Sequence, residues 1–104
     1  MTEYNVIIEP SAAEDLIEIS DYITRVFSEP TTASKLYFSI SDCILSLSNL
    51  PNRHKIISDE PYRSQGIRMI SVKNYTVFYL VNEEEFSVHI IRVLYNRRDW
   101  QSIL

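Results

Sequence analysis

The side chains of this sequence that can act on a phosphate group gather in its second half. They are basic or can carry a proton: His54, Lys55, Arg68, Tyr95, Arg97 and Arg98. Cleavage of a phosphodiester without a metal requires a proton acceptor, a proton donor and cations that stabilise the charge of the transition state. Arginine suits the last role, and tyrosine or histidine suits the other two. The same arginines also have a structural reading, because a strand arginine can pair with an acidic side chain of a neighbouring helix.

Other kinds of site have weaker support. The single cysteine, Cys43, and the two histidines, His54 and His89, do not have the spacing of a zinc site. The only glycine is Gly66, so there is no glycine-rich phosphate loop. Cys43 adjoins an apolar helix stripe, which favours packing over nucleophilic chemistry. The numbers of serines, histidines and aspartates do not exclude Ser-His-Asp catalysis, although no nucleophile elbow is present. We therefore predict no metal and no cofactor.

Composition limits the class of protein. A chain of 104 residues, 45% of them hydrophobic, fits one domain spanning residues 1–104. No apolar run approaches the ~18 residues of a membrane helix, and the N-terminus lacks the order of a signal peptide, so we expect a cytoplasmic protein without a membrane partner. Residues 1–50 hold eight acids and two bases, a balance of −6, whereas residues 51–104 hold eight bases and six acids, a balance of +2. The pI of about 5.1 argues against broad nucleic-acid affinity.

The first half predicts a strand and two helices. Residues 4–9 alternate as a short strand, and an amphipathic helix follows that Ser11 can cap, with Glu14 completing a capping box. A second helix starts at Pro30 and ends at Leu50-Pro51. Two helices of about 18–20 residues joined this tightly form an antiparallel hairpin that needs a partner layer.

The second half supplies that layer as three strands, at residues 67–72, 75–81 and 86–95, after an irregular stretch over 52–65. The turn lengths place Arg68 opposite Tyr79 and Tyr79 opposite Val88; likewise Val72 faces Tyr75, which faces Arg92. One face is the expected core, with Ile70, Val72, Tyr75, Val77, Tyr79, Val81, Phe86, Val88 and Ile90. The other is the candidate working face, with Met69, Ser71, Thr76, Phe78, Leu80, Ser87, His89, Ile91 and Val93. The prediction is an α+β fold: an N-terminal strand and an antiparallel helix hairpin packed on a mostly antiparallel C-terminal sheet.

Several motifs spread from Tyr4 to Trp100 together resemble the RelE/ParE toxin superfamily. They are Ala12-Ala13-Glu14-Asp15-Leu16, Tyr22-Ile23, Leu50-Pro51, Gly66-Ile67-Arg68, Tyr75-x-x-Phe78-Tyr79 and Ile91-Arg92-Val93-Leu94-Tyr95-x-Arg97-Arg98-Asp99. The resemblance implies the toxin of a bacterial type II toxin–antitoxin module, held inactive by a cognate antitoxin protein. RelE-like members enter the ribosomal A site and cut mRNA without a metal, whereas ParE-like members poison DNA gyrase.

Four features favour the ParE-like alternative. The helix hairpin occupies about 40 residues, longer than in the compact RelE-like ribonucleases, and the ending from Arg92 to Asp99 is similar to the ParE ending, in which a histidine commonly stands at the position of Tyr95. Asn96 stands where the nuclease members place arginine or histidine, and asparagine cannot move a proton near neutral pH. The acidic balance also fits poorly with binding in ribosomal RNA.

Other features keep a RelE-like ribosome-dependent mRNA endonuclease open, as well as a partner-binding homologue with neither activity. In the RelE-like alternative Arg68 matches the strand arginine that acts on the scissile phosphate, and the catalytic residues are Arg68, Tyr95 and Arg98. The residues expected to bind the cellular target are His54, Lys55, Arg97 and Arg98. Because the helical half is acidic and the sheet half basic, we expect an extended antitoxin segment over the apolar groove between hairpin and sheet.

Overall fold

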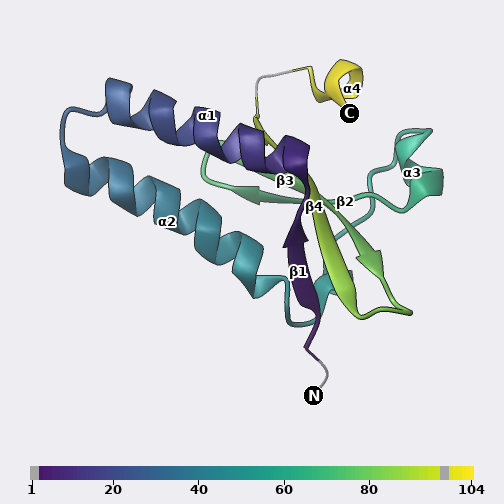
Figure 1. The fold of residues 1–104 in the computed structure, drawn as a ribbon. Coiled ribbons are helices and arrows are strands. Elements are labelled where there is room, and N and C mark those ends of the chain that lie inside the picture. The colour runs from purple at the N-terminus through teal and green to yellow at the C-terminus, as the bar shows by residue number, and fades with distance from the viewer. Residues whose placement is uncertain (1–2, 97–98) are drawn as a thin grey trace.

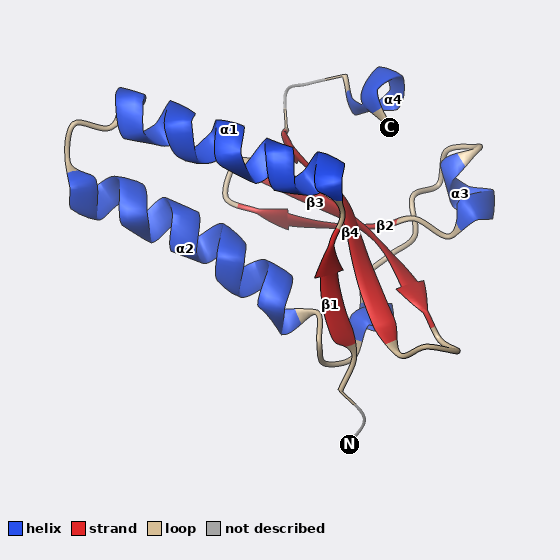
Figure 2. Ribbon diagram, in the orientation of Figure 1, coloured by secondary structure: helices blue, strands red, loops and turns tan. Residues whose placement is uncertain are grey.

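A computed structural model describes residues 3–96 and 99–104. Its elements along the chain are β1 (Asn5–Ile8), α1 (Pro10–Val26), α2 (Pro30–Ser46), the 3-10 turn η1 (Pro51–Arg53), α3 (Tyr62–Gln65), β2 (Arg68–Val72), β3 (Tyr75–Asn82), β4 (Ser87–Tyr95) and α4 (Trp100–Ile103). The α1–α2 hairpin lies over one side of a four-stranded sheet (Figure 1). Helices and strands thus form the predicted α+β fold (Figure 2).

Helix α1 buries the face that its apolar spacing predicts, with Ala12, Ile19 and Ile23 all in the core. It begins one residue before the predicted cap. Pro10 takes the first helical position, Glu9 is the N-cap residue, and no side chain caps the helix. The predicted Ser11 cap is therefore wrong, because proline at the first position already supplies a suitable φ and has no N–H to satisfy.

Helix α2 runs antiparallel to α1 after a link of three residues, 27–29 (Figure 1). Each helix has 17 residues, slightly fewer than predicted. Helix α2 ends at Ser46, four residues before the predicted end, and the chain continues as a hydrogen-bonded turn to Asn49. Leu50 has a positive φ of 47°, which turns the backbone into η1.

The sheet has the strand order β1-β4-β3-β2. Strand β4 is paired with β3 antiparallel and with β1 parallel, and β2 is antiparallel to β3. The N-terminal strand therefore completes the sheet beside the last strand of the chain, since Asn5 aligns with Ser87.

The β2–β3 register is as predicted, but the β3–β4 register is not. Tyr79 pairs with Ile90 instead of Val88, and Tyr75 pairs with Tyr95 instead of Arg92. Strand β3 ends one residue later than predicted, at Asn82, and β4 begins one residue later, at Ser87. This shift of the turn by one residue moves the pairing by two residues and leaves the faces unchanged. A bulge then adds one more residue.

That bulge lies where Phe78 and Tyr79 face Arg92 and Ile90, so Ile91 has no partner of its own. Beyond it the faces of β4 exchange. Val93 joins the core under the helices, and Leu94 turns to the opposite face. The predicted placement of Val93 on the working face is wrong for this reason.

The sheet has an apolar cluster on each face. The cluster under the hairpin consists of Ala12, Ile19, Ile40, Ile44, Leu47, Tyr75, Val77, Tyr79, Val88, Ile90 and Val93. On the other face Phe78 and Leu94 are buried by Ile57 and Ile67, with Trp100 of α4 packed against them. The predicted working face is thus largely a second core. The predicted core residue Phe86 lies instead in the β3–β4 turn, with a φ of 50° and 48% of its surface exposed.

None of the helices in the part of the chain that the structure describes is long and apolar enough to cross a membrane.

Candidate functional site

The predicted site residue Arg68 forms hydrogen bonds with a turn earlier in the chain, at residues 51–54. It is the first residue of β2, and its Nη1 donates to the carbonyl oxygens of Asn52 at 3.1 Å and of His54 at 2.5 Å. On the neighbouring strand the hydroxyl of Tyr79 donates to the carbonyl oxygen of Pro51 at 2.7 Å. Arg68 and Tyr79 therefore hold the turn over residues 51–54 against the sheet, and we call this region the turn end.

The imidazole of His54 at the turn end lies close to two cations, Arg53 and Arg68. Nε of Arg53 donates to Nε2 of His54 at 3.2 Å, which requires that nitrogen to carry no proton. Burial lowers the pKa of His54 below 6.5, and the charges of Arg53 and Arg68 lower it further. His54 is thus a neutral imidazole at pH 7, while the neighbouring Lys55 is exposed.

A second set of hydrogen bonds fixes the turn end to the N-terminus. The carboxylate of Glu83 accepts from the hydroxyl of Tyr4 at 2.7 Å and from the amide of Asn52 at 2.5 Å. Both bonds lower the pKa of Glu83 below 4.5. The turn end therefore joins three distant parts of the chain: Tyr4 just before β1, the turn over 51–54 and the β3–β4 turn.

Tyr95 lies at the opposite end of the sheet. It is the last residue of β4 and pairs with Tyr75, with ring centroids 5.5 Å apart in an edge-to-face arrangement. The next residue, Asn96, is used by the fold, because its side-chain oxygen accepts from the hydroxyl of Thr76 at 2.6 Å and its N–H donates to the carbonyl of Asn74 at 2.9 Å. The predicted site residues Arg97 and Arg98 lie outside the described residues.

The predicted catalytic residues Arg68 and Tyr95 do not come together. Their partners on β3 are Tyr79 and Tyr75, which are four residues apart, or about 13 Å of strand. The Arg68 guanidinium is directed to the turn end, away from Tyr95. Of the predicted residues, His54, Lys55 and Arg68 share one location and Tyr95 is in another.

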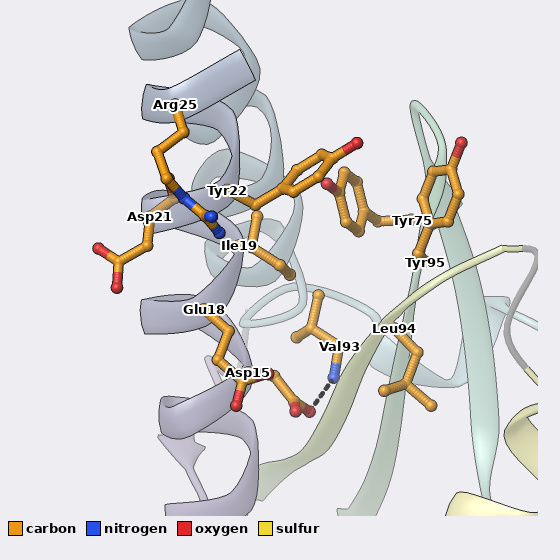
Figure 3. Close-up of a pocket in the computed structure, with 10 residues that line it drawn as sticks. All are labelled: Asp15, Glu18, Ile19, Asp21, Tyr22, Arg25, Tyr75, Val93, Leu94 and Tyr95. Atoms are coloured by element: carbon orange, nitrogen blue, oxygen red, sulfur yellow. Dashed lines mark hydrogen bonds between the residues drawn. The ribbon is translucent and has the colours of Figure 1, made fainter. Parts of the chain in front are cut away.

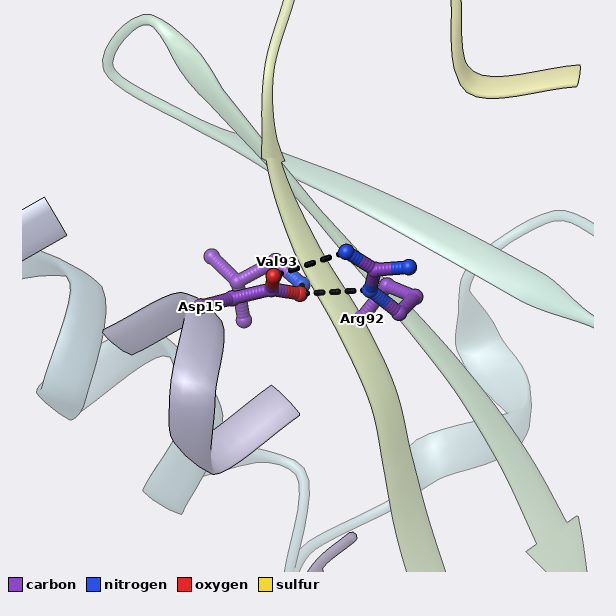
Figure 4. Close-up of polar contacts among 3 residues, drawn as sticks. All are labelled: Asp15, Arg92 and Val93. Atoms are coloured by element: carbon purple, nitrogen blue, oxygen red, sulfur yellow. Dashed lines mark hydrogen bonds and ion pairs between the residues drawn. The ribbon is translucent and has the colours of Figure 1, made fainter. Parts of the chain in front are cut away.

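A carboxylate that accepts three hydrogen bonds joins α1 to β4, and the sequence analysis missed it. Asp15 accepts from Arg92 at 2.7 Å (Nε) and 2.8 Å (Nη2), and from the backbone N–H of Val93 at 3.0 Å (Figure 4). Only 6% of the Asp15 surface is exposed, and its hydrogen bond raises the pKa of Arg92. The expected pairing of a strand arginine with a helix acid therefore occurs at Arg92, not at Arg68. Asp15 stands three residues after Ala12 and four before Ile19, so its position on the buried face was readable from the sequence.

A groove lies between α1 and the ends of β3 and β4 (Figure 3). Its cavity volume is about 510 Å³. The tyrosines Tyr22, Tyr75 and Tyr95 line it together with the α1 side chains Glu18, Asp21 and Arg25. This tyrosine groove matches the predicted apolar groove between the hairpin and the sheet in location, but it carries more polar groups than expected.

A serine, a histidine and a carboxylate do line up elsewhere. Glu9 Oε1 is 2.7 Å from Nδ1 of His89, whose Nε2 is 3.0 Å from the Ser87 hydroxyl. Ser87 is only 2% exposed, so a substrate cannot reach its oxygen. The contacts instead connect the start of α1 to β4. Among the described residues no three metal-binding side chains gather into a group.

Comparison with known proteins identifies the family. A sequence profile of ParE toxins of type II toxin–antitoxin systems, parDE, matches residues 6–100. The chain therefore belongs to the ParE toxin family, within the RelE/ParE superfamily that the sequence motifs predict. No match was found among curated proteins.

Three solved structures share the fold. The chromosomal ParDE system from P. aeruginosa superposes with a TM-score of 0.71 at 20% identity, covering 91% of this chain and 98% of that one. The RelBE2 toxin–antitoxin complex from Mycobacterium tuberculosis has a TM-score of 0.67 at 22% identity, with 91% and 93% covered. The archaeal RelE–RelB complex from Pyrococcus horikoshii OT3 has a TM-score of 0.60 at 20% identity, with 94% and 99% covered.

Proposed function

We propose that this type II toxin is ParE-like and inhibits growth by poisoning DNA gyrase in the cytoplasm. We further propose that residues 1–104 act as one toxin domain that a cognate antitoxin protein neutralises. The family match supports the toxin class, and the arrangement of polar side chains supports the choice of gyrase over the ribosome.

The observation that carries the choice is the separation of Arg68 from Tyr95. A nuclease must place its cation and its proton donor on one phosphodiester, within hydrogen-bond reach of the reacting atoms. Here about 13 Å of strand lies between the two positions, and the Arg68 guanidinium binds two backbone carbonyls. An inhibitor that binds its target needs no such convergence.

Asn96 supports the same proposal. Its carboxamide cannot transfer a proton, and it is bonded to Thr76 at the edge of the sheet. Loss of a positioned acid or base typically costs about 10²–10⁴ in rate. The net charge of −4 also disfavours a binding site made of ribosomal RNA.

We assign target binding to Arg97, Arg98, His54 and Lys55. Planar guanidinium groups suit carboxylate or phosphate recognition, and Lys55 adds an exposed cation. His54 contributes as a neutral imidazole, through hydrogen bonding instead of charge. We expect the double variant R97A/R98A to lose growth inhibition while its melting temperature stays within a few degrees of the wild type. A double variant that folds normally and still inhibits growth would remove both arginines from the assignment.

An antitoxin partner has a simple test. The solved structures that share this fold include toxin–antitoxin complexes. We therefore expect co-expression with the product of the small gene on one side of the toxin gene to give a stable complex. Failure with both neighbouring gene products contradicts this part of the proposal.

Purified toxin distinguishes the two targets. We expect it to trap gyrase on supercoiled DNA as ATP-dependent cleavage complexes and to leave ribosome-bound mRNA intact. The matched variant Tyr95→Phe removes the hydroxyl that is predicted to act in the RelE-like alternative, and we expect it to leave mRNA unaffected as well. A toeprint showing A-site cleavage by the wild type, lost in Tyr95→Phe, would overturn the proposal in favour of a RelE-like ribonuclease.

A further inference from the structure

We propose that the tyrosine groove binds an arginine or lysine side chain presented by the antitoxin. The inference rests on the proposed function for the identity of this partner. It goes further in assigning the chemistry that is recognised, a cation held by aromatic rings and carboxylates.

Aromatic rings form one side of the groove. Tyr22 projects from α1 with half of its surface exposed, Tyr75 is buried at the start of β3, and Tyr95 is 39% exposed at the end of β4 (Figure 3). Three rings thus meet from three different elements. The face of an aromatic ring attracts an ammonium or guanidinium group within about 6 Å of its centroid.

The hydroxyl groups of these tyrosines are available to a ligand. None of the three makes a hydrogen bond with another of the described residues, whereas the hydroxyl of Tyr79 at the turn end does. Burial raises the pKa of Tyr75, and the proximity of Tyr22 and Tyr95 raises it further. Tyr75 is therefore a neutral phenol at pH 7, which can accept a hydrogen bond from an N–H donor.

The charges that line the groove favour a cation. The negative charge of Asp15 is already matched by Arg92. Glu18 and Asp21 have no cation of the described residues within 4.0 Å, although Arg25 is near them. Nε of Arg25 donates to the backbone carbonyl of Asp21 at 3.4 Å. An incoming cation thus meets two carboxylates that form no ion pair with the residues the structure describes.

The size of the groove favours a peptide segment over a free ion. About 510 Å³ lies within the range of roughly 300–1,000 Å³ that is usual for ligand pockets and exceeds what one ion requires. A single-stranded nucleic acid can also stack on tyrosine, but its phosphates would approach Glu18 and Asp21. The observations therefore favour a basic side chain over a nucleic acid.

The test uses the whole toxin and a small probe, so it needs neither antitoxin nor gyrase. Amide resonances are followed by NMR during titration with Nα-acetyl-arginine amide. The citrulline analogue serves as the control, because it has a similar shape and no charge. We expect saturable shifts at Ile19, Tyr22, Tyr75 and Tyr95 with the arginine probe and none with citrulline.

Variants identify the groups that bind. We expect Tyr22→Leu and the double variant E18Q/D21N each to weaken binding about two- to fivefold, as exposed cation–π and ion-pair contacts predict. The matched double variant D42N/E84Q changes the net charge equally at two exposed positions outside the groove, and we expect it to bind like the wild type. Unchanged spectra away from the groove verify folding in each case.

Three results would overturn the inference: equal shifts with citrulline, no saturable shift with arginine, or equal weakening by E18Q/D21N and D42N/E84Q. Binding of a thymidine oligonucleotide in the groove, without binding of arginine, would assign the site to nucleic acid instead. Failure of gyrase trapping changes none of these outcomes, so the inference and the choice of target fail separately.

Discussion

The two ends of the helix-facing side of the sheet use their polar side chains differently. At the turn end, Arg68 and Tyr79 are bonded to backbone carbonyls of the same chain. In the tyrosine groove, the hydroxyls of Tyr75 and Tyr95 have no such partner among the described residues. Arg68, which matches the nuclease arginine, thus holds the fold, whereas Tyr75 and Tyr95 line the cavity.

This difference shows that residue type alone does not distinguish a binding group from a structural one. A guanidinium that donates to backbone carbonyl oxygens has fewer N–H groups left for a ligand. A phenol at the mouth of a cavity retains its full hydrogen-bonding capacity. Removing a hydrogen-bonded group leaves its partner unsatisfied and lowers the free energy of unfolding, whereas removing an unbonded group does not. The two ends of the sheet are therefore expected to respond differently to substitution.

The largest effect is expected at the ion pair beside the groove. Asp15→Ala leaves Arg92 without its carboxylate and the Val93 N–H without an acceptor. Removing one partner of a largely buried pair costs about 3–5 kcal/mol, measurable by denaturant unfolding. The control Glu14→Ala changes an exposed neighbour on α1 and is expected within about 0.5 kcal/mol of the wild type. A loss below about 1 kcal/mol for Asp15→Ala contradicts an anchoring role.

The next effect is expected at Arg68. Arg68→Met keeps most of the aliphatic stem and removes the bonds to the carbonyls of Asn52 and His54. Hydrogen bonds from a charged group contribute about 1.5–3 kcal/mol, so we expect a loss of that size in the free energy of unfolding. Arg63→Met, at an exposed position on α3, is the matched control and is expected to be nearly neutral. Equal stability of the two variants would mean that Arg68 does not hold the turn.

A pair of tyrosine variants compares the two ends directly. Tyr79→Phe loses a buried hydrogen bond to Pro51 and is expected to lose about 0.5–1.5 kcal/mol. Tyr75→Phe loses a hydroxyl without a partner among the described residues and is expected to change stability by less than about 0.5 kcal/mol. Equal losses of stability in the two variants would contradict the difference between the turn end and the groove.

The contribution of Tyr79 to stability depends on pH. Burial raises the pKa of Tyr79 from 10.0 to about 12. The unfolded chain therefore releases this proton first, so the stability it contributes is present in full below pH 10 and is lost as the pH rises toward 12. Denaturant unfolding across this range is expected to show a smaller decline for Tyr79→Phe than for the wild type.

The smallest effect concerns His54. Its pKa lies below 6.5, so the unfolded chain takes up a proton first as the pH falls; the contribution to stability is present above pH 6.5 and is lost below it. NMR titration of the imidazole measures the value. Arg53→Gln removes one of the cations that lower this pKa and is expected to move it back toward 6.5. An unchanged pKa in Arg53→Gln would leave burial and Arg68 as the only causes.

Most of the fold was predictable because its signals are local. The apolar period of α1 and the alternation along β2 and β3 specify which faces are buried, and the short turn between β2 and β3 specifies their register. The β3–β4 register was not predictable by counting, because the turn begins one residue later than expected and Ile91 forms a bulge. A bulge depends on packing around it, and its effect on Val93 and Leu94 has no local signal.

The site was less predictable, for a related reason. Residue types identified His54, Lys55 and Arg68, and the turn brings these three together, but only side-chain geometry shows that Arg68 is bonded internally. The exchange of faces after the bulge also places Tyr95 beside Tyr75 in the groove. Arg97 and Arg98 remain predictions.

The pairing of β1 with β4 has a consequence for the synthesis of the toxin. The first strand of the chain has its place in the sheet only beside Ser87 to Ile90, so it waits for the ribosome to deliver the last strand. At about 5–20 residues translated per second, the sheet can close only once all residues up to β4 have been made. A message that is cut short before β4 therefore yields no finished sheet. The cell that makes this toxin is exposed to it only after β4 has been translated.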